Sequence, residues 1–284
     1  MVNTDSYYEI GSGHTFCQDY VDNGVVEING AKFYYSICCD GCSGSKDSDV
    51  GARLIAKSFP RALRYALTDA EGREQYLAEY IKVCLKNRIM NFIEQMECPL
   101  WVFDATIAAI VYDEEKDKLY SFGWGDGKFL YKHKDGTADL VSIDYTSNAP
   151  YYLTYELSGF RAASYEESFG TDFATISRHI VSGDTVLHNK ILDQNKARFY
   201  YEVTSNASQT LVSASVFTDG IDTYHKKDDV DLTMPRSNLF NQLTQYKGTH
   251  GEFVKRRMMK VKQFCQKEGW QHFDDVGVGT ISLL

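Results

Sequence analysis

Proline is scarce in this sequence of 284 residues, and nothing marks a flexible linker. Only four prolines are present, and no stretch rich in Ser, Gly or Pro interrupts the chain. With 43% apolar residues, the chain can bury a sizeable core. We therefore expect residues 1–284 to form a single domain.

Long apolar runs and a basic start are also lacking. The opening MVNTDSYYEI has no Lys or Arg and no apolar core, and every apolar stretch is far shorter than a membrane span. Secretion and membrane association are therefore not expected. The seven cysteines form an odd number, and four of them lie between Cys17 and Cys42, which is typical of reduced thiols. The cytoplasm is the expected location.

The chain has fewer basic than acidic residues. The chain has 30 Lys and Arg against 39 Asp and Glu, a formal net charge of −9. Binding to a nucleic-acid backbone requires a basic patch, so nucleic acid is not an expected partner. Acidic residues also keep proteins soluble, and they become informative only where several converge in one place.

Hydrophobic patterns predict strands and helices in a mixed order. Residues 32–40, KFYYSICCD, are aromatic and β-branched and predict a buried strand that ends at Asp40. Turn residues at 116–117 and 135–136 divide residues 106–136 into what we expect to be an antiparallel meander. Apolar residues at helical spacing predict helices over 50–67, 75–96 and 252–268. Residues 211–220 and the last nine residues predict further strands, and 140–210 predict strands with an irregular excursion.

Acidic residues recur where strands begin or end. The pairs are Asp40-Gly41, Asp219-Gly220 and Asp274-Asp275, with Gln18-Asp19 and Gly125-Asp126 as a fourth and fifth. Asp-Gly is also a common turn, so one pair alone is as well explained by a turn. Several carboxylates that meet on a rigid sheet must bind cations or take up protons. Oxygen ligands suit Mg²⁺ or Mn²⁺, and two such ions about 3.5–4 Å apart can activate a shared water for attack on phosphorus.

The order of these motifs resembles the metal-dependent serine/threonine protein phosphatases of type 2C over nearly the whole chain. The segments that carry the resemblance are His14-x-x-x-Gln18-Asp19, CCDGCSG at 38–44, Asp104-Ala105-Thr106, Gly125-Asp126-Gly127-Lys128, Thr218-Asp219-Gly220 and Asp274-Asp275. The resemblance implies an α+β fold, a four-layer α-β-β-α sandwich with two antiparallel sheets face to face and helices on both outer faces. It also implies a variable flap within residues 140–210, beside the active site.

Site residues follow from the same resemblance. Asp40 would bridge two metal ions, with Asp219 and Asp274 completing one site. Asp19 and the carbonyl oxygen of Gly41 would serve the second site. Asp126, together with Asp219, would correspond to a third, weaker metal position, so two or three Mn²⁺ or Mg²⁺ ions are expected. Asp40, Asp219 and Asp274 are the expected catalytic residues.

Two positions depart from the family pattern. His14 stands where the family has a phosphate-binding Arg, and it offers a single donor whose charge depends on pH. His14 is thus either a phosphate contact or a surface residue without a catalytic role. Cys42 stands where some members have a His proposed to protonate the leaving group, so metal-bound water would take that role.

Other phosphate and metal chemistries fit the sequence poorly. None of the cysteines has Arg six residues downstream, as cysteine-based phosphatases require. A zinc site from Cys38, Cys39, Cys42 and His14 is disfavoured, since strand alternation points Cys38 and Cys39 to opposite faces. FGWGDGK lacks the spacing and the Ser/Thr of a P-loop.

The predicted activity is hydrolysis of phosphoserine and phosphothreonine in proteins, by attack of a metal-bridging hydroxide on phosphorus. A phosphoprotein substrate and a cognate kinase would be the partners, in a signalling role. Two alternatives remain: a catalytically weak pseudophosphatase that acts as a regulatory binding module, and a phosphatase of small molecules.

Overall fold

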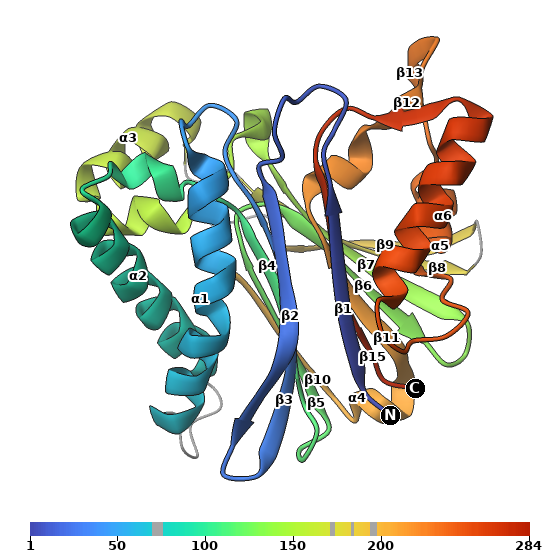
Figure 1. Ribbon diagram of the computed structural model, residues 1–284, viewed down its shortest axis with the longest axis horizontal. Coiled ribbons are helices and arrows are strands. Elements are labelled where there is room, and N and C mark those ends of the chain that lie inside the picture. The colour runs from blue at the N-terminus through green and yellow to red at the C-terminus, as the bar shows by residue number, and fades with distance from the viewer. Residues whose placement is uncertain (70–75, 171–173, 183–184, 194–197) are drawn as a thin grey trace.

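Two antiparallel sheets occupy the middle of the molecule, as seen in a computed structural model that describes residues 1–69, 76–170, 174–182, 185–193 and 198–284 (Figure 1). The five-stranded sheet has the order β10 (Tyr200–Ser205), β5 (Lys118–Trp124), β4 (Ile107–Asp113), β3 (Ala31–Asp40) and β2 (Asp19–Ile28). The seven-stranded sheet has the order β1 (Asn3–Glu9), β15 (Val276–Ser282), β11 (Leu211–Phe217), β6 (Gly127–His133), β7 (Thr137–Tyr145), β8 (Ala174–Ser182) and β9 (Thr185–Asp193). A small third sheet contains β13 (Asp229–Thr233), β12 (Tyr224–Lys226) and β14 (Trp270–His272).

Helices lie on both sides of the two large sheets (Figure 1). The described residues form six α-helices: α1 (Ser48–Asp69), α2 (Leu77–Met96), α3 (Gly159–Phe169), α4 (Ala207–Thr210), α5 (Arg236–Thr244) and α6 (Phe253–Glu268). The three predicted helices correspond to α1, α2 and α6, although Gln75, the predicted start of the second, lies outside the described residues. Within the described part of the chain, no helix combines the length and apolar character needed to cross a membrane.

Buried apolar side chains form three clusters, which hold the sheets and helices together. One cluster joins the five-stranded sheet to α1 and α2, for example through the rings of Tyr35 and Phe59, whose centres are 6.0 Å apart. A second cluster lies between the sheets and contains Cys38 and Val216. A third joins the seven-stranded sheet to α5 and α6. Cys38 belongs to the second cluster and its neighbour Cys39 to the first, so the two point to opposite faces of β3, as strand alternation predicts.

The predicted meander over 106–136 is wrong in its last strand. β4 and β5 pair as expected, but β6 pairs with β7 and β11 in the other sheet. The chain crosses between the sheets at Asp126, flanked by Gly125 at φ +80° and Gly127 at φ +146°. Such backbone conformations are accessible mainly to glycine, and they let the chain leave one sheet and enter the other. The mixed composition of helices and antiparallel sheets is confirmed.

Candidate metal centre and active site

Five strand-associated aspartates come together at one end of the two sheets. Asp40 is the last residue of β3, and Asp19 is the first residue of β2 and its register partner. The other three lie in connections between strands: Asp126 between β5 and β6, Asp219 two residues after the end of β11, and Asp274 before β15. These strands belong to both large sheets, so the fold gathers carboxylates from widely separated parts of the sequence.

Asp40, Asp126 and Asp219 form the tightest group. One carboxylate oxygen from each lies within 4.8 Å of those of the other two. They line a cavity of about 110 Å³, which Asp274 also lines. The remaining lining residues are Gln18, Gly41, Cys42, Ser43, Asn148, Pro150 and Tyr152. The cavity lining is therefore mostly oxygen-bearing, with carboxylates on several sides.

Burial and mutual repulsion make these carboxyls difficult to ionise. The pKa of Asp40 lies well above its usual range because of burial, followed by the charges of Asp19, Asp219 and Asp126. The pKa of Asp126 is raised in the same way by burial and by Asp219. For Asp219, burial and Asp274 raise the pKa from 3.8 to about 6. A divalent cation among these groups would offset both effects.

Asp19 is only 3% exposed and lies behind this group. Its Oδ2 atom accepts a hydrogen bond of 2.7 Å from the Thr218 hydroxyl. Its Oδ1 atom is buried and has no hydrogen-bond partner within the described ranges. Burial and the charge of Asp275 raise the pKa of Asp19, although the hydrogen bond from Thr218 acts to lower it. A fully buried carboxylate oxygen without a hydrogen-bond partner is suited to coordinate a cation.

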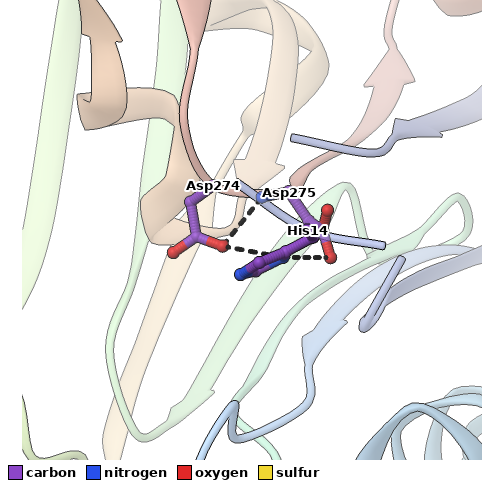
Figure 2. A group of neighbouring side chains, drawn as sticks. All are labelled: His14, Asp274 and Asp275. Atoms are coloured by element: carbon purple, nitrogen blue, oxygen red, sulfur yellow. Dashed lines mark hydrogen bonds and ion pairs between the residues drawn. The ribbon is translucent and has the colours of Figure 1, made fainter. Parts of the chain in front are cut away.

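Asp274 and Asp275 have different surroundings, because Asp274 lines the cavity and Asp275 is buried. Asp275, 1% exposed, accepts hydrogen bonds from the backbone N–H groups of Gly11 (2.7 Å) and Gln18 (2.5 Å). His14 Nδ1 lies 3.1 Å from Asp275 Oδ2 and 3.5 Å from Asp274 Oδ1, so its ring faces both carboxylates (Figure 2). Asp275 thereby fixes the segment that carries His14 and Asp19. His14 itself does not line the cavity, and its predicted contact with phosphate stays a prediction.

The loop after β3 is held against the segment that precedes β4. The Cys42 N–H donates to the Asp104 carbonyl (2.8 Å), and the Ser48 hydroxyl donates to the Cys42 carbonyl (2.8 Å). Gly41 approaches Ser48 so closely that a Cβ would lie 2.8 Å from the Ser48 backbone, which explains the glycine. Gly41 and Cys42 are therefore fixed at the rim of the cavity.

An ion pair between buried Asp104 and partly exposed Arg161 was not predicted from the sequence. Asp104, 2% exposed, receives bonds from both Arg161 terminal nitrogens (3.0 and 2.6 Å) and from the Thr154 hydroxyl (2.5 Å). Ser45 donates to the same carboxylate at 3.2 Å. Residues within 140–210 are thus joined to the loop that follows Asp40. An acidic residue before the strand at 107 was the only local sign of this contact.

Tyr152 and Asn148 also line the cavity without having been predicted. Both come from the irregular excursion, where the only sequence signal is the cluster of turn residues at 148–150. Burial, followed by Cys42, raises the pKa of the Tyr152 hydroxyl, so this group stays protonated. Among the described residues that line the cavity, none is Lys or Arg.

Lys128 is a buried cation close to the carboxylate group. It is 1% exposed, and its Nζ lies 2.8 Å from Asp222 Oδ2 and 3.2 Å from Asp144 Oδ1. Its charge lowers the pKa of Asp126 and Asp219, against the effect of burial. It therefore favours the ionised state that a metal ligand requires.

Comparisons with known proteins agree with this geometry. The sequence profile described as Protein phosphatase 2C matches residues 10–261. No individual protein among the curated sequences matches the chain.

Several solved structures share the fold at low sequence identity. A bacterial serine phosphatase is 12% identical, with a TM-score of 0.53 over 100% of this chain and 98% of that chain. The serine/threonine phosphatase Stp1 from Staphylococcus aureus is 13% identical, with a TM-score of 0.52 over 99% of this chain and 95% of that one. The serine/threonine phosphatase PstP/Ppp from Mycobacterium tuberculosis is 12% identical, with a TM-score of 0.50 over 99% and 98%. Because the profile match extends over most of the sequence, this protein belongs to the protein phosphatase 2C family.

Proposed function

We propose that this protein hydrolyses phosphoserine and phosphothreonine in phosphoproteins with the help of bound Mg²⁺ or Mn²⁺ ions. The observation that carries the proposal is the meeting of Asp40, Asp126, Asp219 and Asp274 in one cavity. Such crowding of carboxylates is costly in a purely structural role, because burial and the neighbouring charges raise the pKa of Asp40 and of Asp219. Membership of the phosphatase family supports the same activity.

The ligand assignment follows the order of the motifs. Asp40 would bridge two ions, Asp219 and Asp274 would complete one site, and Asp19 with the Gly41 carbonyl would serve the other. Asp126 lies beside Asp219 and would hold a third, weaker ion with it. Bound in this way, the ions would lower the pKa of a shared water and supply the hydroxide that attacks phosphorus.

The chain's own residues position the substrate and the ligands. Ser43 and Asn148 line the cavity and offer neutral donors to phosphate oxygens. Asp275 holds the backbone that carries Asp19, and Thr218 fixes one Asp19 oxygen. Lys128 keeps positive charge behind Asp126 and Asp219 without entering the cavity lining.

We further infer that the layers form the four-layer α-β-β-α sandwich of a single domain over residues 1–284. The variable flap would include the excursion around residues 148–152, which line the cavity. The contact of Arg161 with Asp104 supports a flap that is fixed at one point to the catalytic loop.

One assay distinguishes the remaining activities. Purified protein is given a phosphoserine peptide and an aryl phosphate, each with Mn²⁺ and with a chelator. Metal-dependent release of phosphate from both substrates is expected. Turnover of the aryl phosphate with no turnover of any phosphopeptide would favour a small-molecule phosphatase. Metal uptake without any turnover would favour a regulatory binding module and contradict the proposal.

A further inference from the structure

Residues 244–263 carry a concentration of positive charge in an otherwise acidic chain. Their cations are Lys247, Lys255, Arg256, Arg257, Lys260 and Lys262, and their only carboxylate is Glu252. The chain as a whole has a formal charge of −9. Positive charge concentrated against the overall sign indicates a local site for an anion.

Four of these cations, together with Lys132, line two adjoining cavities, which we call the basic cleft. One cavity, of about 530 Å³, is lined by Arg256 and Lys260, and the other, of about 370 Å³, by Lys132. Lys247 and Arg257 line both cavities and join them. Within the described ranges, no Asp or Glu side chain lines either cavity.

The walls of the cleft are held in place. Arg257 donates from Nε to the Gln242 carbonyl and from a terminal nitrogen to Gln242 Oε1 at 3.2 Å. Tyr246 shares a hydrogen bond of 2.9 Å with the Thr280 hydroxyl, and its ring packs edge-on against Phe253 at 4.9 Å. Arg257 has five N–H donors, and Gln242 engages two of them. The guanidinium is therefore positioned in advance, with donors left for a ligand.

Lys132 and Arg257 are brought together without a counter-ion. Burial, followed by the charge of Arg257, lowers the pKa of Lys132, and burial lowers the pKa of Arg257. Among the described residues, the hydrogen-bond acceptor of Lys132 Nζ is the Thr244 carbonyl, at 3.4 Å. In the described part of the chain, no ion pair joins a carboxylate, that of Leu284 included, to the cations lining the cleft. An anionic ligand would remove this repulsion.

We propose that the basic cleft binds a phosphorylated, acidic peptide segment of a protein partner. Two cavities that meet at Lys247 and Arg257 suit an extended chain with several negative groups. Phe253 and Met259 in one cavity and Val212 in the other add apolar wall for the peptide's other side chains. A flat bilayer surface would not enter such hollows.

The cleft lies at the end of the seven-stranded sheet away from the aspartates. Asp126, Asp219 and Asp275 adjoin β6, β11 and β15 at one end, and the cleft residues Lys132, Val212 and Ser282 lie at the other end of the same strands. Seven residues of strand span about 20 Å. A partner that occupied both places would need at least about six extended residues between them.

The test measures binding separately from hydrolysis. Fluorescence anisotropy follows a fluorescein-labelled peptide with several phosphoserines among glutamates, in chelator, so that turnover is suppressed. We expect Lys132→Gln/Arg257→Gln to weaken binding at least about tenfold relative to wild type. Because Lys247 is exposed, Lys247→Glu should also weaken peptide binding without affecting the fold. Arg61→Gln/Arg64→Gln removes two exposed charges from α1 and should bind as wild type does.

Controls distinguish peptide binding at the basic cleft from catalysis and from binding of other anions. Aryl phosphate turnover with Mn²⁺ should be equal in all these proteins, which separates this proposal from the catalytic one. Peptide affinity that is equal in wild type and in both cleft variants would overturn the proposal. The proposal would also be overturned if the cleft bound inorganic phosphate as tightly as the peptide, or if it bound phosphatidylserine vesicles and not the peptide.

Discussion

Two adjacent carboxylates, Asp274 and Asp275, differ in what surrounds them. Asp274 lines the cavity, whereas Asp275 is buried and accepts the N–H groups of Gly11 and Gln18. Asp274 accepts one backbone bond, from the Asp275 N–H at 2.8 Å, and lines the cavity, whereas both oxygens of Asp275 are satisfied by the chain. The sequence alone does not separate these roles, because the partners of Asp275 lie more than 250 residues away.

Alanine substitution should separate the two residues. Asp275→Ala leaves two buried N–H donors unpaired and should lower the free energy of unfolding by about 2–4 kcal/mol. Asp274→Ala relieves repulsion on Asp219 but removes the acceptor of the Asp275 N–H (2.8 Å), so it should change the stability of the metal-free protein less than Asp275→Ala does, and it should reduce Mn²⁺-dependent turnover. Chemical denaturation in chelator, together with a phosphatase assay, measures both. Equal destabilisation by the two substitutions would contradict the division of roles.

The crowded carboxyls also predict how stability depends on pH. In metal-free protein the folded state holds protons on Asp40, Asp126 and Asp219, whereas the unfolded chain releases them near the ordinary carboxyl pKa of 3.8. Above pH 3.8 the folded state therefore holds more protons than the unfolded chain, and its stability falls as the pH rises through the folded-state pKa values. Asp219 alone, with a pKa of about 6, would account for on the order of 2–3 kcal/mol.

Urea denaturation in chelator at about pH 5 and about pH 8 checks this expectation. Wild type should be less stable at the higher pH, and Asp40→Asn should show a smaller decrease because it removes a charge from the centre of the group. A free energy of unfolding that rises between these two values would refute the repulsion described for the cavity.

Among the secondary-structure elements, those with strong periodicity were predicted, whereas the polar edge strands β1 and β2 were not. β3, α1, α2 and α6 carry continuous apolar patterns that the core explains. β1 and β2 lie at sheet edges, and their sequences NTDSYYE and DYVDNGVVEI contain many polar residues. Asp5 in β1 is buried because it accepts the Val254 and Lys255 N–H groups of α6, a contact that no local pattern reveals.

The pairing of β6 shows a second limit of local pattern. Alternation predicts that residues 127–133 form a strand, but it does not specify which strand pairs with it. The crossing at Asp126 depends on the positive φ angles of Gly125 and Gly127. The same crossing places Asp126 beside Asp40 and Asp219.

Replacement of Gly125 should therefore affect both stability and the site. Gly125→Ala forces φ +80° on alanine and places a Cβ 2.9 Å from Thr106 Cγ2. We expect a loss of about 2–3 kcal/mol and reduced turnover at limiting Mn²⁺, since Asp126 is displaced. Gly136→Ala is the matched control, because φ is +89° and nothing lies near its Cβ. It should cost about 1 kcal/mol and keep full activity, and an equal loss of activity in both variants would refute the role given to the crossing.

Over the whole molecule, the site exists only in the folded chain. Asp19, Asp40, Asp126, Asp219 and Asp274 are brought together by strands from both sheets, and the order of their motifs predicted this proximity, while their role as metal ligands stays a prediction. Residues that border the same cavity from the irregular excursion, such as Tyr152, were not predicted. Their positions depend on tertiary contacts such as Arg161 with Asp104, for which the sequence has no periodic signal.

Metal binding should stabilise this assembled state. Mn²⁺ that binds the folded chain and not the unfolded one would add about 2.7 kcal/mol at a concentration one hundred times the dissociation constant. The gain should be larger at about pH 8 than at about pH 5, because protons compete with the ion for the same carboxyls. Thermal denaturation with and without Mn²⁺ at both pH values measures it, and an unchanged midpoint at both would contradict metal binding.

The most direct measurement is the number of Mn²⁺ ions bound per chain, obtained by titrating the metal-free protein and following the electron paramagnetic resonance signal of free Mn²⁺. Wild type should bind two or more ions, and Asp40→Asn should lose the uptake that depends on the bridging carboxylate while it remains folded. Wild-type protein that binds no Mn²⁺, or an Asp40→Asn variant that binds as many ions with the same affinity, would contradict a metal centre built from these aspartates.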